Sequence, residues 1–358
     1  MQDSSRPGSI PPALKPGGTI AFISPSARLN TRLPAAISRA RSVLLARGYK
    51  TRVFFKEDSD LSSSVTNRLA EIRDAFFDAE VSAVICTIGG GTFTELLPSL
   101  CSDKELCAHI RKHPKIVVGS SDMTGLHWFL NAHAKLQTFY GPSAIPELGA
   151  NGDIAKKTSP LAFCVQYLLE AIATPKPLGD MPRSLFYAPE APAYFADPNS
   201  VKEQAVVSTP GWRWLRNGKA QGRLFGGCLT VVVRLNGMSD IRPDWEDRII
   251  FLETSMGEES RDLDVVRTAF ADLIAQGVFE KPAGLVLGRP FGYDSDERRK
   301  EFENVFWEGL CLIPSQDFPV LCNVDFGHTT PMVTLPYYAM AELDSENNRF
   351  AILEAGVA

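Results

Sequence analysis

Apolar and polar positions follow two alternating patterns along the first 130 residues. Amphipathic stretches at 31–47 and 64–79 place their apolar side chains at helical spacing. Short apolar runs flank them and predict buried strands at 18–24, 51–55, 81–88 and 115–119. Strands that alternate with helices at this interval pair in parallel through right-handed crossovers. The pattern therefore predicts an open α/β sheet in the N-terminal part.

The alternation returns in the second half and predicts another α/β domain, whose sheet starts within 222–235. Further strands are expected at 212–214, 248–253, 283–288, 319–324, 338–343 and 350–353, and helices at 261–276 and 296–310. Between the halves, a helix at 163–172 precedes a stretch rich in Pro, Ala and Asp. We expect an N-terminal domain over 1–175, an interdomain crossover over 176–210 and a C-terminal domain over 211–358.

Length and charge narrow the class of protein. The 358 residues suffice for two cores, because a single core stops growing near ~250–300 residues. A net charge of −5 and a pI near 5.7, with no Lys/Arg cluster, argue against binding to nucleic acid or to an anionic membrane. Small molecules are the partners that this composition favours.

Cysteine usage and the N-terminus bear on location. The seven cysteines are scattered and never spaced as C-x-x-C, which disfavours a disulfide framework or a zinc site. The first nine residues lack the apolar core of a signal peptide, and no apolar run reaches the ~18 residues of a membrane span. The prediction is a cytoplasmic protein in a reducing compartment.

The stretch over 115–130 predicts a strand, a tight turn at 119–122 and a helix. A nucleophile elbow of this kind pushes a serine out at the carboxyl edge of a sheet, beside the amide N–H groups of the helix start. Those groups stabilise negative charge on a tetrahedral intermediate, so a serine here could be a nucleophile. From this stretch alone, a Ser or Asp before a helix is more often a plain N-cap, and only the rest of the chain can favour a nucleophile.

A glycine triplet at 89–91 ends the preceding predicted strand. It lies on the same edge of the sheet, where ligands bind in open α/β folds. The triplet lacks the GK[ST] of a P-loop and the GxGxxG of a dinucleotide site. Close approach of backbone N–H groups to an oxyanion explains it, and so does an ordinary turn. Two special turns on one edge suggest one site.

A nucleophilic serine needs a base that can be neutral near pH 7, which makes histidine the first candidate. Among five histidines, His328 follows a glycine after a predicted strand, whereas the other four lie in helical stretches. A carboxylate must orient such an imidazole. Glu253 ends an otherwise apolar strand, where an unpaired carboxylate would be costly to bury. Either His328 or a structural Arg or Lys could be its partner.

Six segments resemble motifs of the LD-carboxypeptidase family of serine peptidases, in the same order over nearly the whole chain. They span 14–26, 88–98, 118–124, 222–227, 250–254 and 327–336. The residues at 327–332 and around Trp212 and Trp214 are more similar to the microcin C immunity peptidase branch than to the murein-trimming branch.

The resemblance implies a catalytic triad of Ser121, His328 and Glu253, and an oxyanion hole of the backbone N–H groups of Gly90 and Asp122. It also implies a flavodoxin-like or amidotransferase-like parallel-sheet domain, a C-terminal α/β domain, no cofactor or metal, and a homodimer. The expected activity is serine hydrolysis of an amide next to a free carboxylate or in a peptide-nucleotide conjugate.

Contacts with a small peptide-like substrate are expected from Gly91, Trp212 and Trp214, although two tryptophans in a strand equally suit a core or a dimer contact. The chain departs from the family at Ser120, where an aromatic residue is usual, and at Tyr338, where glycine is usual. These departures leave two other readings open: acyl transfer or amide cleavage in a biosynthetic pathway, and a non-catalytic small-molecule binding protein.

Overall fold

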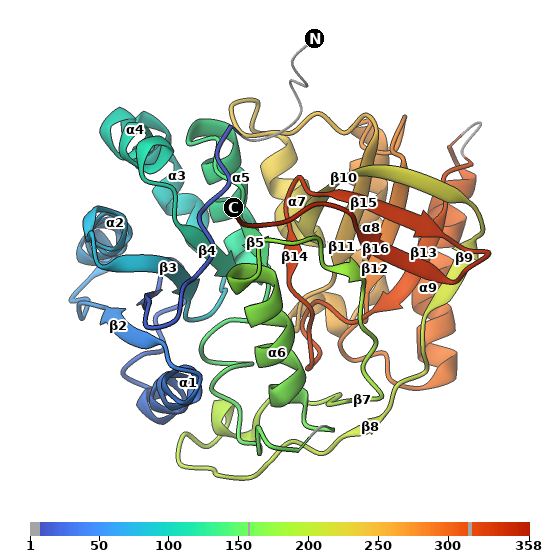
Figure 1. The fold of residues 1–358 in the computed structure, drawn as a ribbon. Helices are drawn as coiled ribbons and strands as arrows, with labels where there is room; N and C mark the ends of the chain where they lie inside the picture. The colour runs from blue at the N-terminus through green and yellow to red at the C-terminus, as the bar shows by residue number, and fades with distance from the viewer. Residues whose placement is uncertain (1–7, 157, 314–316) are drawn as a thin grey trace.

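Two β-sheets, one built mainly from each half of the chain, organise the fold (Figure 1). The structure is a computed structural model that describes residues 8–156, 158–313 and 317–358. The first seven residues, part of the stretch that lacks a signal-peptide core, lie outside the described residues.

The first sheet has six strands in the order β14-β5-β4-β3-β1-β2. They are β1 Thr19–Ile23, β2 Lys50–Phe54, β3 Val81–Cys86, β4 Ile116–Gly119, β5 Phe139–Tyr140 and β14 Leu335–Pro336. Strands β1 to β5 pair in parallel, and β14 joins β5 in antiparallel register. The order 2-1-3-4-5 is the flavodoxin-like one. The predicted parallel-sheet domain is therefore confirmed.

Helices cover both faces of this sheet, because successive strand residues point to opposite sides. Ile20 and Phe22 pack with α1 and α6, whereas Ala21 and Ile23 belong to a second core that holds the buried faces of α2, α4 and α5. The bounds are α1 Pro34–Ala46, α2 Leu61–Phe77, η1 Phe93–Leu96, α3 Leu97–Ser102, α4 Lys104–Lys112, η2 Ser121–Met123, α5 Thr124–His133 and α6 Pro160–Ala173.

The second sheet has eight strands in the order β6-β16-β15-β10-β11-β12-β13-β9. They are β6 Gly179–Asp180, β9 Arg213–Arg216, β10 Lys219–Cys228, β11 Arg248–Glu253, β12 Gly284–Gly288, β13 Val320–Val324, β15 Met340–Asp344 and β16 Arg349–Ile352. Strands β10 to β13 are parallel and the outer strands antiparallel. Its helices are α7 Leu229–Asn236, η4 Glu258–Ser260, α8 Leu263–Ala275 and α9 Asp296–Cys311. The predicted C-terminal α/β fold is confirmed.

One element differs from the sequence prediction. The apolar run within 222–235 does start the second sheet, but β10 ends at Cys228 and the rest forms α7. The β-branched residues there favour a strand locally. However, Leu229, Val232 and Leu235 are spaced to share one helical face, and α7 packs against α5 and α8. Packing against α5 and α8 therefore stabilises the helix over the strand that the local sequence favours.

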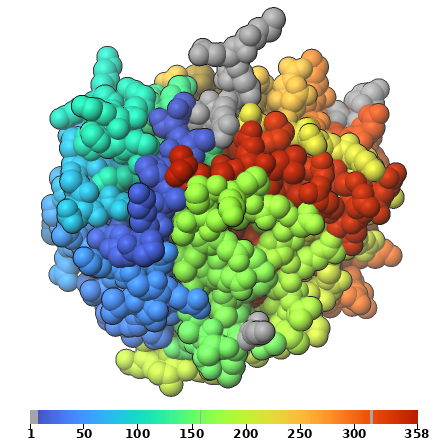
Figure 2. All heavy atoms as spheres, viewed as in Figure 1, coloured from blue at the N-terminus to red at the C-terminus, as the bar shows by residue number. Residues whose placement is uncertain are grey.

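The segment between the halves ties the two sheets together. Strand β6 pairs with β16 in the second sheet, and β7 Phe186–Tyr187 pairs with β8 Val207–Ser208. In Figure 2 this segment, green to yellow-green, fills the face between the blue N-terminal and red C-terminal parts. The domain limits stay a prediction. None of the helices in the described part of the chain is long and apolar enough to cross a bilayer.

Candidate active site

The turn after β4 holds Ser121 in an unusual backbone conformation. Its φ is +62°, in the left-handed region that residues with a side chain seldom adopt. Strain of this kind persists where the surroundings enforce it and is concentrated at functional sites. The Ser121 backbone N–H donates to the Tyr140 hydroxyl at 2.8 Å. The strand–turn–helix predicted here is confirmed, with Ser121 at its apex.

Neighbouring loops clamp this turn from two sides. A side chain at Gly89 would place its Cβ 2.5 Å from the Ser121 Cβ, so only glycine allows the two loops to approach this closely. On the other side, the Thr124 hydroxyl donates to the Ser121 carbonyl at 2.7 Å and accepts from the Cys228 N–H at 3.1 Å. The second sheet therefore fixes the turn carried by the first.

The structure brings the three predicted triad residues together. The His328 Nε2 atom lies 3.0 Å from the Ser121 Oγ atom, and His328 Nδ1 lies 2.7 Å from Glu253 Oε2. A carboxylate only accepts, so Nδ1 carries the proton and Nε2 accepts from the serine hydroxyl. The nucleophile thus faces an unprotonated nitrogen.

Glu253 is 2% exposed at the end of β11 and has a second partner that the sequence did not reveal. The buried Tyr140 hydroxyl donates to Glu253 Oε1. Burial and the nearby Glu253 charge raise the pKa of Tyr140 well above its ordinary value, so it stays a donor. Tyr140 thus links the carboxylate to the Ser121 backbone. A tyrosine in a short strand carries no pattern that marks this role.

His328 follows β13 in a loop that a buried ion pair anchors. Asp325 accepts from the Arg289 guanidinium and from the Ser184 hydroxyl and N–H. Burial lowers the pKa of His328, but the surrounding carboxylates, Glu253 foremost, together outweigh it and hold the pKa above the ordinary value. The imidazolium that forms during proton transfer is therefore stabilised.

The two predicted oxyanion donors lie beside Ser121. The Asp122 side chain is fully buried and accepts from Ser26 Oγ at 2.6 Å, Phe93 N–H at 2.8 Å and Arg234 Nη2 at 2.5 Å. These three bonds fix the backbone directly after the nucleophile. Gly90, with φ +144°, follows β3 and lines the same cavity as Ser121. The role of both N–H groups stays a prediction.

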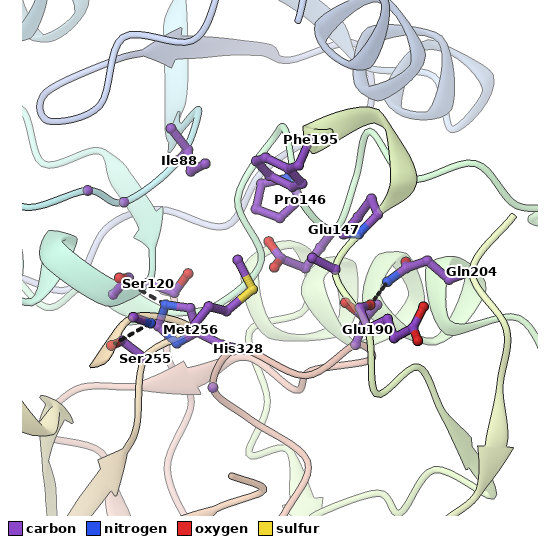
Figure 3. Close-up of a pocket in the computed structure, with 18 residues that line it drawn as sticks. Ile88, Ser120, Pro146, Glu147, Glu190, Phe195, Gln204, Ser255, Met256 and His328 are labelled. Atoms are coloured by element: carbon purple, nitrogen blue, oxygen red, sulfur yellow. Dashed lines mark hydrogen bonds between the residues drawn. The ribbon is translucent and has the colours of Figure 1, made fainter. Parts of the chain in front are cut away.

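A cavity of about 280 Å³ opens beside the serine and histidine. Figure 3 shows its mixed lining, with apolar side chains near Ile88 and Phe195 and carboxyl groups from Glu147 and Glu190. His328 is the histidine that lines it among the described residues. Within the described residues, no group of three or more His, Cys, Asp and Glu side chains is placed to hold a metal ion.

Three predicted substrate contacts lie elsewhere. Gly91, Trp212 and Trp214 are absent from the cavity lining. Trp212 lies under the Arg183 guanidinium, 3.8 Å from the ring centre, and Trp214 donates to Asn348 at 2.9 Å. Trp214 lies in β9, the edge strand that pairs with β13, and Trp212 directly precedes it. Both pack against the core as partly buried side chains. The structure favours the core-packing alternative for them.

Glu147 was not predicted, although it lines the cavity and is 5% exposed. It lies in the loop after β5, and Glu147 Oε2 accepts from the Ser143 N–H at 2.7 Å. Burial raises the pKa of Glu147 to about 7. A glutamate in an irregular loop has no sequence signal that separates it from a solvated one.

Comparison with known proteins places this geometry in a family. The sequence matches the LD-carboxypeptidase N-terminal domain over residues 20–141 and the LD-carboxypeptidase C-terminal domain over 221–343. The chain belongs to the LD-carboxypeptidase family. The predicted family is confirmed, and membership supports a hydrolase, as the carboxypeptidase names among the relatives do.

Relatives of this LD-carboxypeptidase family member match along almost their whole length. A putative carboxypeptidase of Vibrio cholerae is 27% identical, covering 95% of this chain and 96% of its own. The microcin C7 self-immunity protein MccF of Escherichia coli is also 27% identical, covering 94% of each chain. A solved structure of MccF in complex with aspartyl sulfamoyl adenosine has a TM-score of 0.85 at 24% identity, covering 98% of this chain and 100% of that one. That likeness shows a shared fold.

Proposed function

We propose that the protein is a serine peptidase or amidohydrolase with Ser121 as nucleophile, His328 as general base and acid, and Glu253 as the residue that orients His328. The observation that carries the proposal is the hydrogen-bonded series from Glu253 through His328 to Ser121, which ends at a cavity. Membership in the LD-carboxypeptidase family supports it.

The reaction follows from these positions. Ser121 Oγ attacks the amide carbon while His328 Nε2 takes its proton. The N–H groups of Gly90 and Asp122 stabilise the resulting oxyanion. The C–N bond then breaks, and His328 returns the proton to the leaving amine. Water, deprotonated by His328, attacks the acyl-enzyme ester, releases the acid and restores Ser121.

Two substrate classes fit this site. The family name points to an amide next to a free carboxylate. The aspartyl sulfamoyl adenosine bound to MccF supports a peptide-nucleotide conjugate. The homodimer inferred from the family stays a prediction, as does the cytoplasmic location.

Product analysis tests this function. The purified protein is incubated with an L,D-linked muropeptide and with aspartyl sulfamoyl adenosine, and products are identified by mass spectrometry. We expect one amide to be cleaved with uptake of one water, and no cleavage by His328→Ala. Transfer of the acyl group to an added amine in preference to water would favour the acyl-transfer alternative. Binding of both compounds with no turnover would favour a binding protein.

The pH dependence of kcat/KM should show an acid limb with an apparent pKa above 6.5, the ordinary histidine value. The base works only when unprotonated, and Glu253 stabilises its protonated form, so activity rises with pH through a raised pKa. Glu303→Gln, which changes a buried carboxylate outside the cavity lining, is the matched control and should leave the limb in place, whereas Glu253→Gln should move it to lower pH. A limb below 6.5 would contradict the assignment of His328 as base.

A further inference from the structure

The charged side chains that line the cavity are mainly acidic. Its lining includes the carboxyl groups of Glu147 and Glu190, and among the described residues it includes no Lys or Arg. His328 is the one lining side chain that can become cationic, and the proposed function requires it as a base. A substrate group that enters this cavity therefore meets acceptors and negative charge.

Glu147 is the buried member of this pair. It is 5% exposed, and in Figure 3 its carboxyl group points across the cavity toward the side that holds Ser120, Met256 and His328. Its Oε2 atom accepts from the Ser143 N–H at 2.7 Å, and within the described part of the chain it forms no ion pair with a Lys or Arg side chain. Glu190 is exposed and sits beside Gln204 at another part of the lining.

A buried carboxyl group without a cationic partner is costly in its ionised form. The raised pKa of Glu147, about 7, expresses that cost. The charges of Glu147 and His328 also shift each other's pKa, which places the two groups in one electrostatic neighbourhood. A cation bound beside Glu147 would offset the cost through a charge-assisted hydrogen bond. Such uncompensated groups in a cleft mark functional sites.

We propose that Glu147 binds an ammonium group of the substrate, so that the enzyme acts on amides that carry a free amine close to the scissile bond. This inference rests on the proposed hydrolase function and narrows its substrate class. A substrate whose free carboxylate must face Glu147 is disfavoured, because like charges repel in a partly desolvated cavity. Glu190, being exposed, adds a weaker and salt-sensitive attraction.

Binding measurements test this inference without turnover. The Ser121→Ala variant is titrated by calorimetry with two matched pairs: aspartyl sulfamoyl adenosine and its N-acetyl form, and L-alanyl-D-alanine and its N-acetyl form. Acetylation removes the positive charge and leaves the rest of each compound intact. We expect the free amine to bind about tenfold or more tightly than its acetylated form in at least one pair.

Two further substitutions test whether Glu147 is the residue that causes the preference for the free amine. Adding Glu147→Gln should reduce the preference for the free amine to less than about threefold, since the amide keeps the shape but loses the charge. Glu203→Gln is the matched control, because Glu203 is an exposed carboxylate outside the cavity lining, 3.9 Å from Lys156. That control should keep the full preference.

Three results would overturn the inference: equal affinity within both pairs, a preference that survives Glu147→Gln, or no binding by any of the four compounds. The acetylation comparison leaves Glu147 unaltered. Equal affinity within both pairs would therefore contradict the inference even if the Glu147→Gln variant did not fold. Phosphonate labelling of Ser121 in the unaltered protein decides separately whether the hydrolase proposal stands.

Discussion

Replacing Ser121 by alanine is expected to lower kcat by about 10⁴-fold or more while the fold stays intact. The change removes only the hydroxyl that faces His328 Nε2 at 3.0 Å, and the backbone bond from Ser121 N–H to Tyr140 remains. Turnover is measured on the compound that the product analysis identifies, and circular dichroism checks the fold.

The adjacent serine provides the matched control for this change. The Ser120 hydroxyl lies 3.3 Å from the Ser143 hydroxyl, whereas His328 Nε2 is hydrogen-bonded to the hydroxyl of Ser121. Ser120→Ala should therefore keep kcat within about tenfold of the unaltered enzyme. The reverse result, with Ser121→Ala active and Ser120→Ala inactive, would move the nucleophile to the other serine of the turn.

Replacing Glu253 by glutamine is expected to lower kcat by about 10³ to 10⁴-fold. His328 Nδ1–H and the Tyr140 hydroxyl donate to different oxygens of Glu253. In glutamine an NH2 donor replaces one of these oxygens, so His328 loses its preferred tautomer or Tyr140 loses its acceptor. The imidazolium also loses its counter-charge. Burial then dominates, and the acid limb of kcat/KM should move to lower pH.

Another buried carboxylate serves as the control for Glu253→Gln. Glu303 on α9 is 6% exposed, pairs with Arg213 at 2.9 Å and does not line the cavity. Glu303→Gln should leave both kcat and the pH limb unchanged. If Glu253→Gln behaved like Glu303→Gln, the carboxylate would be a structural group and the proposed triad would lose its third member.

Much of this fold could be predicted because the signals are local. Strands β1, β3 and β11 are apolar runs, and α2 and α8 have clear helical periodicity, so their existence follows from pattern alone. The same pattern gave a wrong prediction for the apolar run over 229–235, which forms α7 and not a continuation of the strand. Its β-branched residues are compatible with either element, and only packing against α5 and α8 selects the helix.

The site likewise contains residues that the sequence could predict and residues that it could not. Ser121 follows β4 of the first sheet, whereas Glu253 ends β11 and His328 follows β13 of the second. Within each sheet the carboxyl ends of parallel strands share one edge, so the sequence predicts which residues reach those edges. The packing of the two sheets then brings the three side chains together. The roles of Tyr140 and Glu147 could not be predicted from the sequence. Tyr140 lies in a two-residue strand and Glu147 in an irregular loop, and neither element has a sequence pattern that fixes its position in space. Trp212 and Trp214 show the converse: aromatic residues suggest a binding surface, but in the structure they lie at the edge of the second sheet and outside the cavity lining. Their contact with substrate stays a prediction.

The position of a phosphonate adduct tests the central claim most directly. The purified protein is treated with an active-site serine phosphonate, and the modified residue is found by peptide mass spectrometry, with His328→Ala and Glu253→Ala as controls. The account predicts one adduct, on Ser121, that is lost in both controls because the hydroxyl is no longer activated. An adduct on Ser120, or none on the unaltered protein, would contradict the account.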